Sequence, residues 1–237
     1  MRSFTHKFAA IAAFALAVGA AHAATPSHLY KFSGNFVDTF AGPEMVSNGG
    51  TLSAGSYHFA ANEGLVLDGA LSANLYTIDI SFKFDQTDGY RRILDFKNGG
   101  VDTGLYNLSS ALNFYTAETG AGGAFANGQQ VRVTVSRDAA GSFAGYVNGM
   151  LQFAFTDSGD LASFDTANQR AVFFQDDNQV GGEASAGSVD YIAIYDQALS
   201  GAEIATLTAP VPEPESYILM LAGLLTVAAV VKRRARS

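Results

Sequence analysis

The chain has 237 residues, with 22 acidic against 14 basic side chains and a formal net charge of −8. Six of the basic residues but only two of the acidic ones lie in the two terminal segments described below, which leaves a net charge of −12 for the rest. This acidity argues against nucleic-acid binding, which needs clustered lysine and arginine. The absence of cysteine excludes disulfides and thiol chemistry.

The first residues have the pattern of a secretory signal peptide. A positively charged start and an apolar run precede Ala21-His22-Ala23, which is an A-x-A cleavage site. We therefore expect export of the chain, with cleavage at Ala21 and Ala23 removing residues 1–23 from the fold. An uncleaved membrane helix is the alternative, and the small residues of the cleavage site disfavour it.

Period-two alternation of apolar and polar residues dominates the chain between its terminal segments. Residues 78–85, 131–136 and 151–156 alternate in this way, which is typical of strands with one buried face. Further strands are predicted at residues 29–36, 55–60, 64–67, 91–96, 110–115, 172–174 and 188–195.

Turn and helix signals separate these strands. Asn148-Gly149 predicts a two-residue hairpin because both positions readily take positive φ, and residues 138–141 mark another hairpin. Ser200 is placed to cap a short helix, with Glu203 three residues later for a capping box. About ten or eleven short strands joined by turns predict a β-sandwich.

The C-terminal part of this domain carries a family resemblance. Residues 187–200, followed by Glu203-Ile204, resemble the closing strand and turn of the laminin G-like, concanavalin A-like jelly roll. Residues 131–149 are similar to its preceding paired strands, and 173–187 to a segment of exported bacterial members. The resemblance covers residues 28–207 and implies an all-β, two-sheet antiparallel jelly-roll sandwich. That fold serves lectins, glycosidases, adhesion modules and structural domains, so it does not fix function.

Signals for catalysis are weak. Glycosidases need two carboxylates at the scissile bond, and the resemblance implies that both would lie on one strand as E-x-D-x-x-E. None of the domain's glutamates has that spacing: Glu44, Glu63, Glu118, Glu183 and Glu203. The chain also lacks the G-x-S-x-G elbow of a hydrolytic triad. We expect no enzyme, no catalytic residue, and no convergent carboxylate pair with one protonated member on the concave sheet.

Three aspartates form the candidate metal site. Asp176 and Asp177 end an apolar strand, and Asp190 begins the closing strand. In related jelly rolls an aspartate at the Asp190 position often holds calcium together with backbone carbonyls, so the resemblance implies one structural calcium ion. The alternatives are that Asp176 and Asp177 cap a turn, and that Asp190 pairs with an arginine or faces solvent.

Tyrosines are the other candidate ligand contacts, because their rings can stack on sugars where they are exposed. The candidate tyrosines are Tyr57, Tyr90, Tyr106, Tyr115 and Tyr146. We expect most of them to be core or cross-strand partners, and the sequence assigns no sugar-binding residue.

The C-terminal segment has three parts in a fixed order. Pro212-Glu213-Pro214 is followed by an uncharged apolar run at 217–231 and then by a basic stop. The residues of this stop are Lys232, Arg233, Arg234 and Arg236. The arrangement resembles the PEP-CTERM sorting signal of Gram-negative bacteria. It implies an exosortase-type processing enzyme as partner, cleavage near Pro-Glu-Pro, and a transient inner-membrane anchor. A permanent tail anchor is the alternative.

The sequence thus divides into a signal peptide at 1–23, a laminin G-like jelly-roll domain at 24–209 and a sorting tail at 210–237. We expect a non-catalytic exported protein of the cell surface, outer envelope or extracellular matrix, which binds an extracellular polysaccharide or another surface partner. The alternatives are a carbohydrate-active enzyme on the same fold and a purely structural matrix protein.

Overall fold

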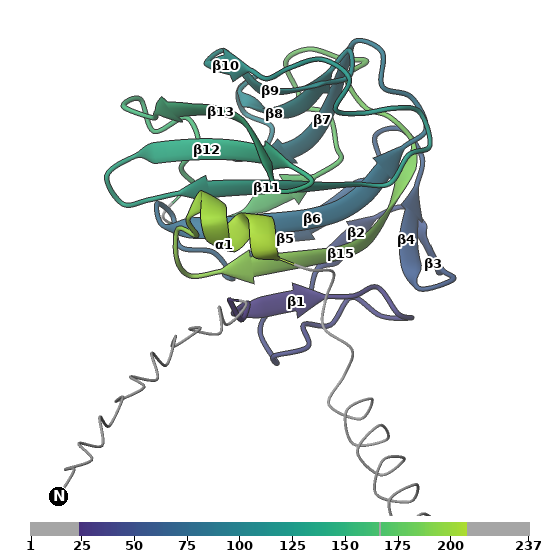
Figure 1. Ribbon diagram of the computed structural model, residues 1–237. Helices are drawn as coiled ribbons and strands as arrows, with labels where there is room; N and C mark the ends of the chain where they lie inside the picture. The colour runs from purple at the N-terminus through teal and green to yellow at the C-terminus, as the bar shows by residue number, and fades with distance from the viewer. Residues whose placement is uncertain (1–23, 166, 208–237) are drawn as a thin grey trace, which may run out of the picture.

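The computed structural model describes residues 24–165 and 167–207, which form two antiparallel sheets packed face to face (Figure 1). The expected jelly-roll sandwich is therefore confirmed. The signal peptide with Ala21 and Ala23 lies outside the described residues, as do the Pro212-Glu213-Pro214 signal, the apolar run 217–231 and the basic stop. Within the described part of the chain, no helix is long and apolar enough to cross a membrane.

One sheet has eight strands, in the order β13-β12-β11-β6-β15-β4-β3 with β1 paired to β15. Its strands are β1 (His28–Tyr30), β3 (Thr51–Ser53), β4 (Ser56–Phe59), β6 (Tyr76–Phe84), β11 (Val131–Arg137), β12 (Ser142–Val147), β13 (Met150–Thr156) and β15 (Gly187–Tyr195). The long strands β6 and β15 lie at its centre, where both faces are covered.

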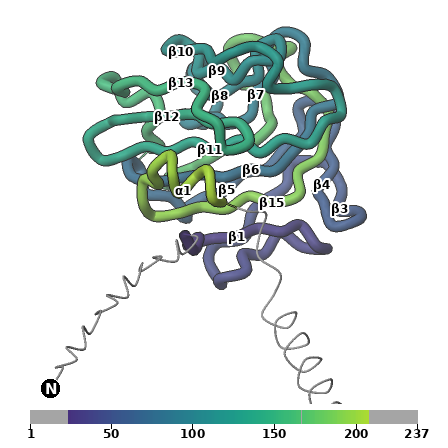
Figure 2. The backbone as a smooth tube through the Cα atoms, viewed as in Figure 1, coloured from purple at the N-terminus to yellow at the C-terminus, as the bar shows by residue number. Residues whose placement is uncertain are grey.

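The other sheet has seven strands, in the order β10-β9-β8-β7-β14-β5-β2. Its strands are β2 (Val46–Asn48), β5 (Gly64–Leu67), β7 (Tyr90–Asp95), β8 (Gly104–Leu108), β9 (Ala111–Tyr115), β10 (Glu118–Thr119) and β14 (Ala171–Phe173). Figure 2 shows β7 to β10 running above β11, β6 and β15 of the first sheet.

The core between the sheets is built from aliphatic and aromatic side chains of alternate strand positions. On β8 and β9 the core-facing residues are Leu105, Leu112 and Phe114, and the residues between them therefore face outward from the seven-stranded sheet. A second apolar cluster covers the outer face of the eight-stranded sheet, where helix α1 (Gly201–Thr206) packs through Ile204.

Local signals predicted these elements well where a turn or cap defined them. Asn148 and Gly149 have φ of 52° and 81° and join β12 to β13, as expected for the hairpin. The Ser200–Glu203 capping box is present at α1. The predicted strand 29–36 is wrong beyond Tyr30, because Phe32 takes a φ of 54° and ends it. Strands β2, β3, β8 and β10 were not predicted.

Candidate functional site

The outer face of the seven-stranded sheet carries a buried arginine surrounded by carboxylates. Arg92 of β7 has no exposed surface. Its Nη1 lies 3.0 Å from Asp95 Oδ2, and its Nη2 lies 3.4 Å from Asp102 Oδ1 and 3.9 Å from Glu183 Oε2. Nη2 also donates to Asp177 Oδ2. Four carboxylates thus share one guanidinium.

Asp95 lies at the end of β7, and two loops bring the other three carboxylates to this strand. Asp102 lies just before β8, and Asp177 and Glu183 lie in the segment between β14 and β15. The second segment is tied to β7 because the Arg92 backbone N–H donates to the Glu183 carbonyl at 2.8 Å. Gly104 leaves room for the arginine, since a Cβ there would lie 2.6 Å from Arg92 Nη1.

Tyrosines continue this face beside the arginine. Tyr106, the register partner of Arg92, packs its ring under the guanidinium with 4.5 Å from Cζ to the ring centroid. The Tyr106 hydroxyl donates to Asp102 Oδ1 at 3.1 Å. Tyr90 and Tyr115 stand edge-on to each other, with centroids 5.7 Å apart, and each also meets the Tyr106 ring.

Exposure separates the members of this group. Tyr106 is fully buried, whereas Tyr90 and Tyr115 are partly exposed. The Asp177 side chain is closed off from solvent, but those of Asp102 and Glu183 are 26% and 14% exposed. We call the exposed set of Tyr90, Tyr115, Asp102 and Glu183, with Tyr106 beneath it, the tyrosine–carboxylate patch.

The environment separates the carboxylates by their proton affinity. Burial, followed by the charge of Asp102, raises the pKa of Glu183. Burial likewise raises the pKa of Asp102, and the nearby Asp177 adds to the rise. Burial also tends to raise the pKa of Asp177. Hydrogen bonds from the Val180 and Gln179 amides and the charge of Arg92 outweigh it, so the pKa of this carboxyl is lowered.

Carboxylates therefore converge on the outer face of this sheet, while the expectation that the concave sheet holds no convergent pair with one protonated member stays a prediction. Ligand atoms of Asp102, Asp177 and Glu183 lie within 4.8 Å of one another. The sequence contains no linear motif for this group, because its members come from separate loops. The sequence could have indicated it only through Arg92, a charged residue inside the predicted strand 91–96.

The three predicted calcium ligands do not meet in one place. Asp177 joins the group at Arg92, while Asp176 closes its own loop by accepting from the Asp177 and Glu183 amides. Asp190 lies in the other sheet, where its Oδ1 accepts from the Ser56 hydroxyl at 2.7 Å. The turn-capping alternative describes Asp176 and Asp177 better than the metal hypothesis does.

A calcium ion also does not fit the one group of carboxylates that converges within the described residues. The point where these carboxylates converge is occupied by Arg92 Nη2, which lies 3.4 Å from Asp102 Oδ1 and 3.9 Å from Glu183 Oε2, so an ion that needs six to eight oxygen ligands does not fit there. Both carboxylate oxygens of Asp177 are engaged, Oδ2 by Arg92 and Oδ1 by the Gln179 and Val180 amides. The structural calcium remains an untested expectation of the family resemblance.

We expect calcium to leave the thermal unfolding midpoint of the protein unchanged. An ion that binds only the folded state, at a free concentration of about 100 times its Kd, would raise the free energy of unfolding by about 2.7 kcal/mol. For a domain of this size that corresponds to a rise in Tm of roughly 5 to 10 °C. Thermal melts of the full chain in millimolar calcium and in chelator test this. A rise of several degrees with calcium would restore a metal site and require ligands outside the Arg92 group.

The eight-stranded sheet also carries hollows. A hollow of about 460 Å³ at β3 and β4 is lined by His58, Glu63 and Asp85, and Glu63 Oε2 accepts from the Ala60 amide at 2.8 Å.

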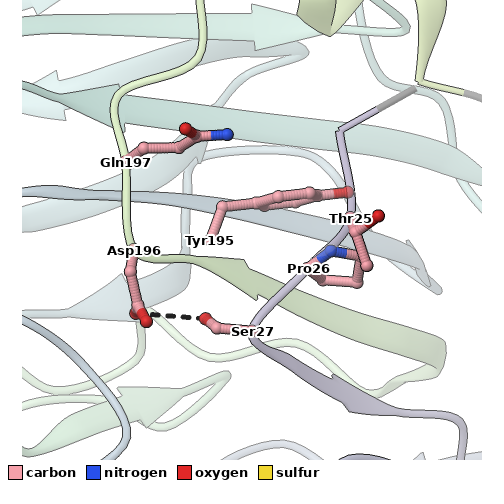
Figure 3. A pocket seen from close by; sticks show the side chains of 6 residues that line it. All are labelled: Thr25, Pro26, Ser27, Tyr195, Asp196 and Gln197. Atoms are coloured by element: carbon pink, nitrogen blue, oxygen red, sulfur yellow. Dashed lines mark hydrogen bonds between the residues drawn. The ribbon is translucent and has the colours of Figure 1, made fainter. Parts of the chain in front are cut away.

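Two more hollows lie on the same sheet. One, of about 280 Å³, opens between the segment before β1 and the end of β15 (Figure 3). Its carboxylate, Asp196, accepts from Ser27 Oγ at 3.1 Å. The other, of about 530 Å³, lies beside α1. Its carboxylate, Asp138, accepts hydrogen bonds from the amides of Ala140 and Ser142 in the β11–β12 turn.

The family model described as "Concanavalin A-like lectin/glucanases superfamily" matches residues 59–205, which is more than half of the chain. The protein therefore belongs to this family of laminin G-type jelly rolls. No curated protein matches the chain.

Solved structures of the same fold come from proteins of different kinds. The sialidase of Trypanosoma rangeli, in complex with 2,3-difluorosialic acid, has a TM-score of 0.59 at 15% identity, over 76% of this chain and 32% of its own. Domain 4 of AbnA, a GH43 extracellular arabinanase from Geobacillus stearothermophilus in complex with arabinotriose, has a TM-score of 0.57 at 18% identity, over 78% of this chain and 98% of its own.

Botulinum neurotoxin type C, whose cell entry depends on two ganglioside molecules, has a TM-score of 0.57 at 13% identity, over 75% of this chain and 49% of its own. The chain thus spans about a third of the sialidase and half of the neurotoxin chain. At these identities the likeness concerns the fold.

Proposed function

We propose that the protein is a non-catalytic, exported glycan-binding protein that acts at the cell surface or in the extracellular matrix. The observation that carries this proposal is the tyrosine–carboxylate patch. Tyr90 and Tyr115 present aromatic surface, and Asp102 and Glu183 place hydrogen-bond acceptors beside it. Sugars offer apolar C–H faces and hydroxyl donors, so this pairing suits them.

The rigidity of the patch supports the same function. Tyr106 is held by the Arg92 guanidinium against its ring and by Asp102 at its hydroxyl, so the tyrosine cluster needs no rearrangement to meet a ligand. Among the proteins of this fold, the arabinanase domain in complex with arabinotriose matches almost along its whole length. This supports carbohydrate as the class of ligand.

A glycan array probed with the full chain tests the proposal. Selective retention of particular oligosaccharides is the expected result. If no glycan is retained and no polysaccharide is altered, the purely structural matrix role replaces binding.

The carboxylate group favours one alternative function, glycoside hydrolysis. Asp102 and Glu183 both have raised pKa values and oxygens within 4.8 Å of each other. Retaining glycosidases place their two carboxyl groups about 5–5.5 Å apart, with one protonated. Release of products from labelled polysaccharides, abolished by both Asp102→Asn and Glu183→Gln, would establish this enzyme and contradict the non-catalytic proposal.

Export and surface sorting complete the proposal. They rest on the sequence of the terminal segments: the A-x-A site before Ala24, and Pro212-Glu213-Pro214 with its apolar run and basic stop. An exosortase-type enzyme would be the processing partner, and the apolar run would hold the precursor in the inner membrane until cleavage.

We expect two truncations in the exported protein. Intact mass measurement of the surface form should show loss of the residues before Ala24 and of the tail from near Pro-Glu-Pro, because both segments have the form of processing signals. A mass that retains residues 217–231 would replace sorting with a permanent tail anchor. A mass that retains residues 1–23 would replace the cleaved signal with a membrane helix.

A further inference from the structure

The tyrosine–carboxylate patch has an excess of negative charge on its solvent side. Four carboxylates contact Arg92, and that guanidinium has no exposed surface. The neighbouring cations point elsewhere. Lys97 donates to the Asp160 and Ser163 carbonyls, and Arg91 binds the Gly182 carbonyl and Asp88. A ligand at Tyr90 and Tyr115 therefore meets carboxylates and does not reach the arginine.

The exposed charged groups of the patch are carboxylates, which accept hydrogen bonds. Glu183 Oε2 is buried and has no hydrogen-bond partner among the described residues. Asn113, the register partner of Tyr106 on β9 and only 5% exposed, likewise leaves Oδ1 without a donor there. These atoms are buried, as are the unpartnered Arg91 Nε and Arg92 Nε, so a ligand at the surface meets the exposed parts of the Asp102 and Glu183 side chains instead. An ionised carboxylate accepts hydrogen bonds and donates none, so these exposed parts favour a ligand that donates.

Charge and hydrogen bonding together favour one chemical class of ligand. A primary ammonium group has three hydrogen-bond donors and a positive charge, opposite to that of Asp102 and Glu183. It therefore forms charge-assisted hydrogen bonds with carboxylates. An N-acetyl group removes both the charge and two of those donors. A sugar acid would place a carboxylate against two others, which is unfavourable.

We infer that the tyrosine–carboxylate patch selects glycans that carry free primary amino groups over their N-acetylated, neutral and acidic counterparts. This inference rests on the proposed glycan binding and specifies its ligand. Tyr90 and Tyr115 contact the sugar ring, and Asp102 and Glu183 receive the ammonium group.

Calorimetric titration of the full chain with four tetrasaccharides tests the inference. The probes are a glucosamine tetramer, its fully N-acetylated form, cellotetraose and tetragalacturonate. We expect the glucosamine tetramer to bind about tenfold more tightly than the N-acetylated form at low salt, with the difference shrinking as salt screens the charges. Equal or tighter binding of the N-acetylated or neutral probe would overturn the amine preference and leave glycan binding standing. Binding of none of the four would contradict both.

A pair of charge-matched variants separates the patch from the overall acidity of the domain. Glu183→Gln removes one negative charge at the patch, and Asp196→Asn removes one at the end of β15 in the other sheet. We expect Glu183→Gln to abolish most of the preference for the free amine while N-acetylated binding remains, and Asp196→Asn to change neither. If both variants lower the preference equally, the attraction is that of net charge alone and the inference fails.

Discussion

Replacing Arg92 with methionine should lower the free energy of unfolding by about 3 to 5 kcal/mol, because it leaves buried carboxylates without their partner. The side chains of Asp177 and Asp95 are 0% and 2% exposed, so neither recovers hydration when the guanidinium is gone. Urea denaturation of the full-length variant and wild type measures the difference.

The matched control is Arg170→Met. Arg170 pairs with Asp68 at 2.7 Å, but the two side chains are 34% and 46% exposed, so its loss should cost less than about 1 kcal/mol. An equally small effect of Arg92→Met would show that the arginine does not stabilise the carboxylate group. Adding Asp177→Asn to Arg92→Met should recover part of the loss, since it removes one of the orphaned charges.

The cost of Arg92→Met should also shrink as the pH falls. In the wild type the pKa of Asp177 is lowered, so its contribution to stability is present above the unfolded pKa and disappears on acidification through the folded value. In the variant this carboxyl has lost its cation and its pKa rises, so protonation relieves the unpaired charge. A difference that grows on acidification would contradict this explanation.

Replacing Tyr90 or Tyr115 with alanine should weaken glycan binding by about five- to thirtyfold each, as expected for aromatic residues at the centre of a binding surface. The change removes the ring that the sugar contacts, and the edge-on packing of the two rings makes their effects interdependent. Titration with an oligosaccharide retained on the glycan array measures the loss.

Two controls show whether the ring itself is responsible. Tyr90→Phe and Tyr115→Phe keep the ring and should keep most of the affinity. Phe40→Ala removes an aromatic side chain that is 49% exposed in the loop after β1, and should leave binding unchanged. If Phe40→Ala weakens binding as much as the tyrosine changes do, the patch is not the binding surface.

Much of the fold could be predicted from local sequence because local physics determines it. The Asn148-Gly149 turn needs only two residues that accept positive φ, and the Ser200–Glu203 box needs only its own backbone. The strand 172–174 was predicted one residue out of place because Phe174 takes a φ of 66°, a conformation that its residue type does not suggest.

The candidate site could be predicted only in part, because its geometry is non-local. Arg92 and Asp177 are 85 residues apart, and a loop after β14 brings them together. Tyr90, Tyr106 and Tyr115 were considered by residue type, but no alternation pattern distinguishes the buried Tyr106 from its partly exposed neighbours. The grouping of Asp177 with Asp190 came from resemblance, and the sheet topology separates the two.

The glycan should lie on the tyrosine–carboxylate patch, and NMR of the tyrosine rings in the full chain tests this location most directly. The chain has 10 tyrosines and no tryptophan, and single Tyr→Phe variants assign their signals. On addition of an oligosaccharide that the protein binds, we predict chemical-shift changes at Tyr90 and Tyr115. Changes confined to Tyr146 and Tyr195, which lie in the apolar cluster on the outer face of the eight-stranded sheet, would contradict binding at the patch.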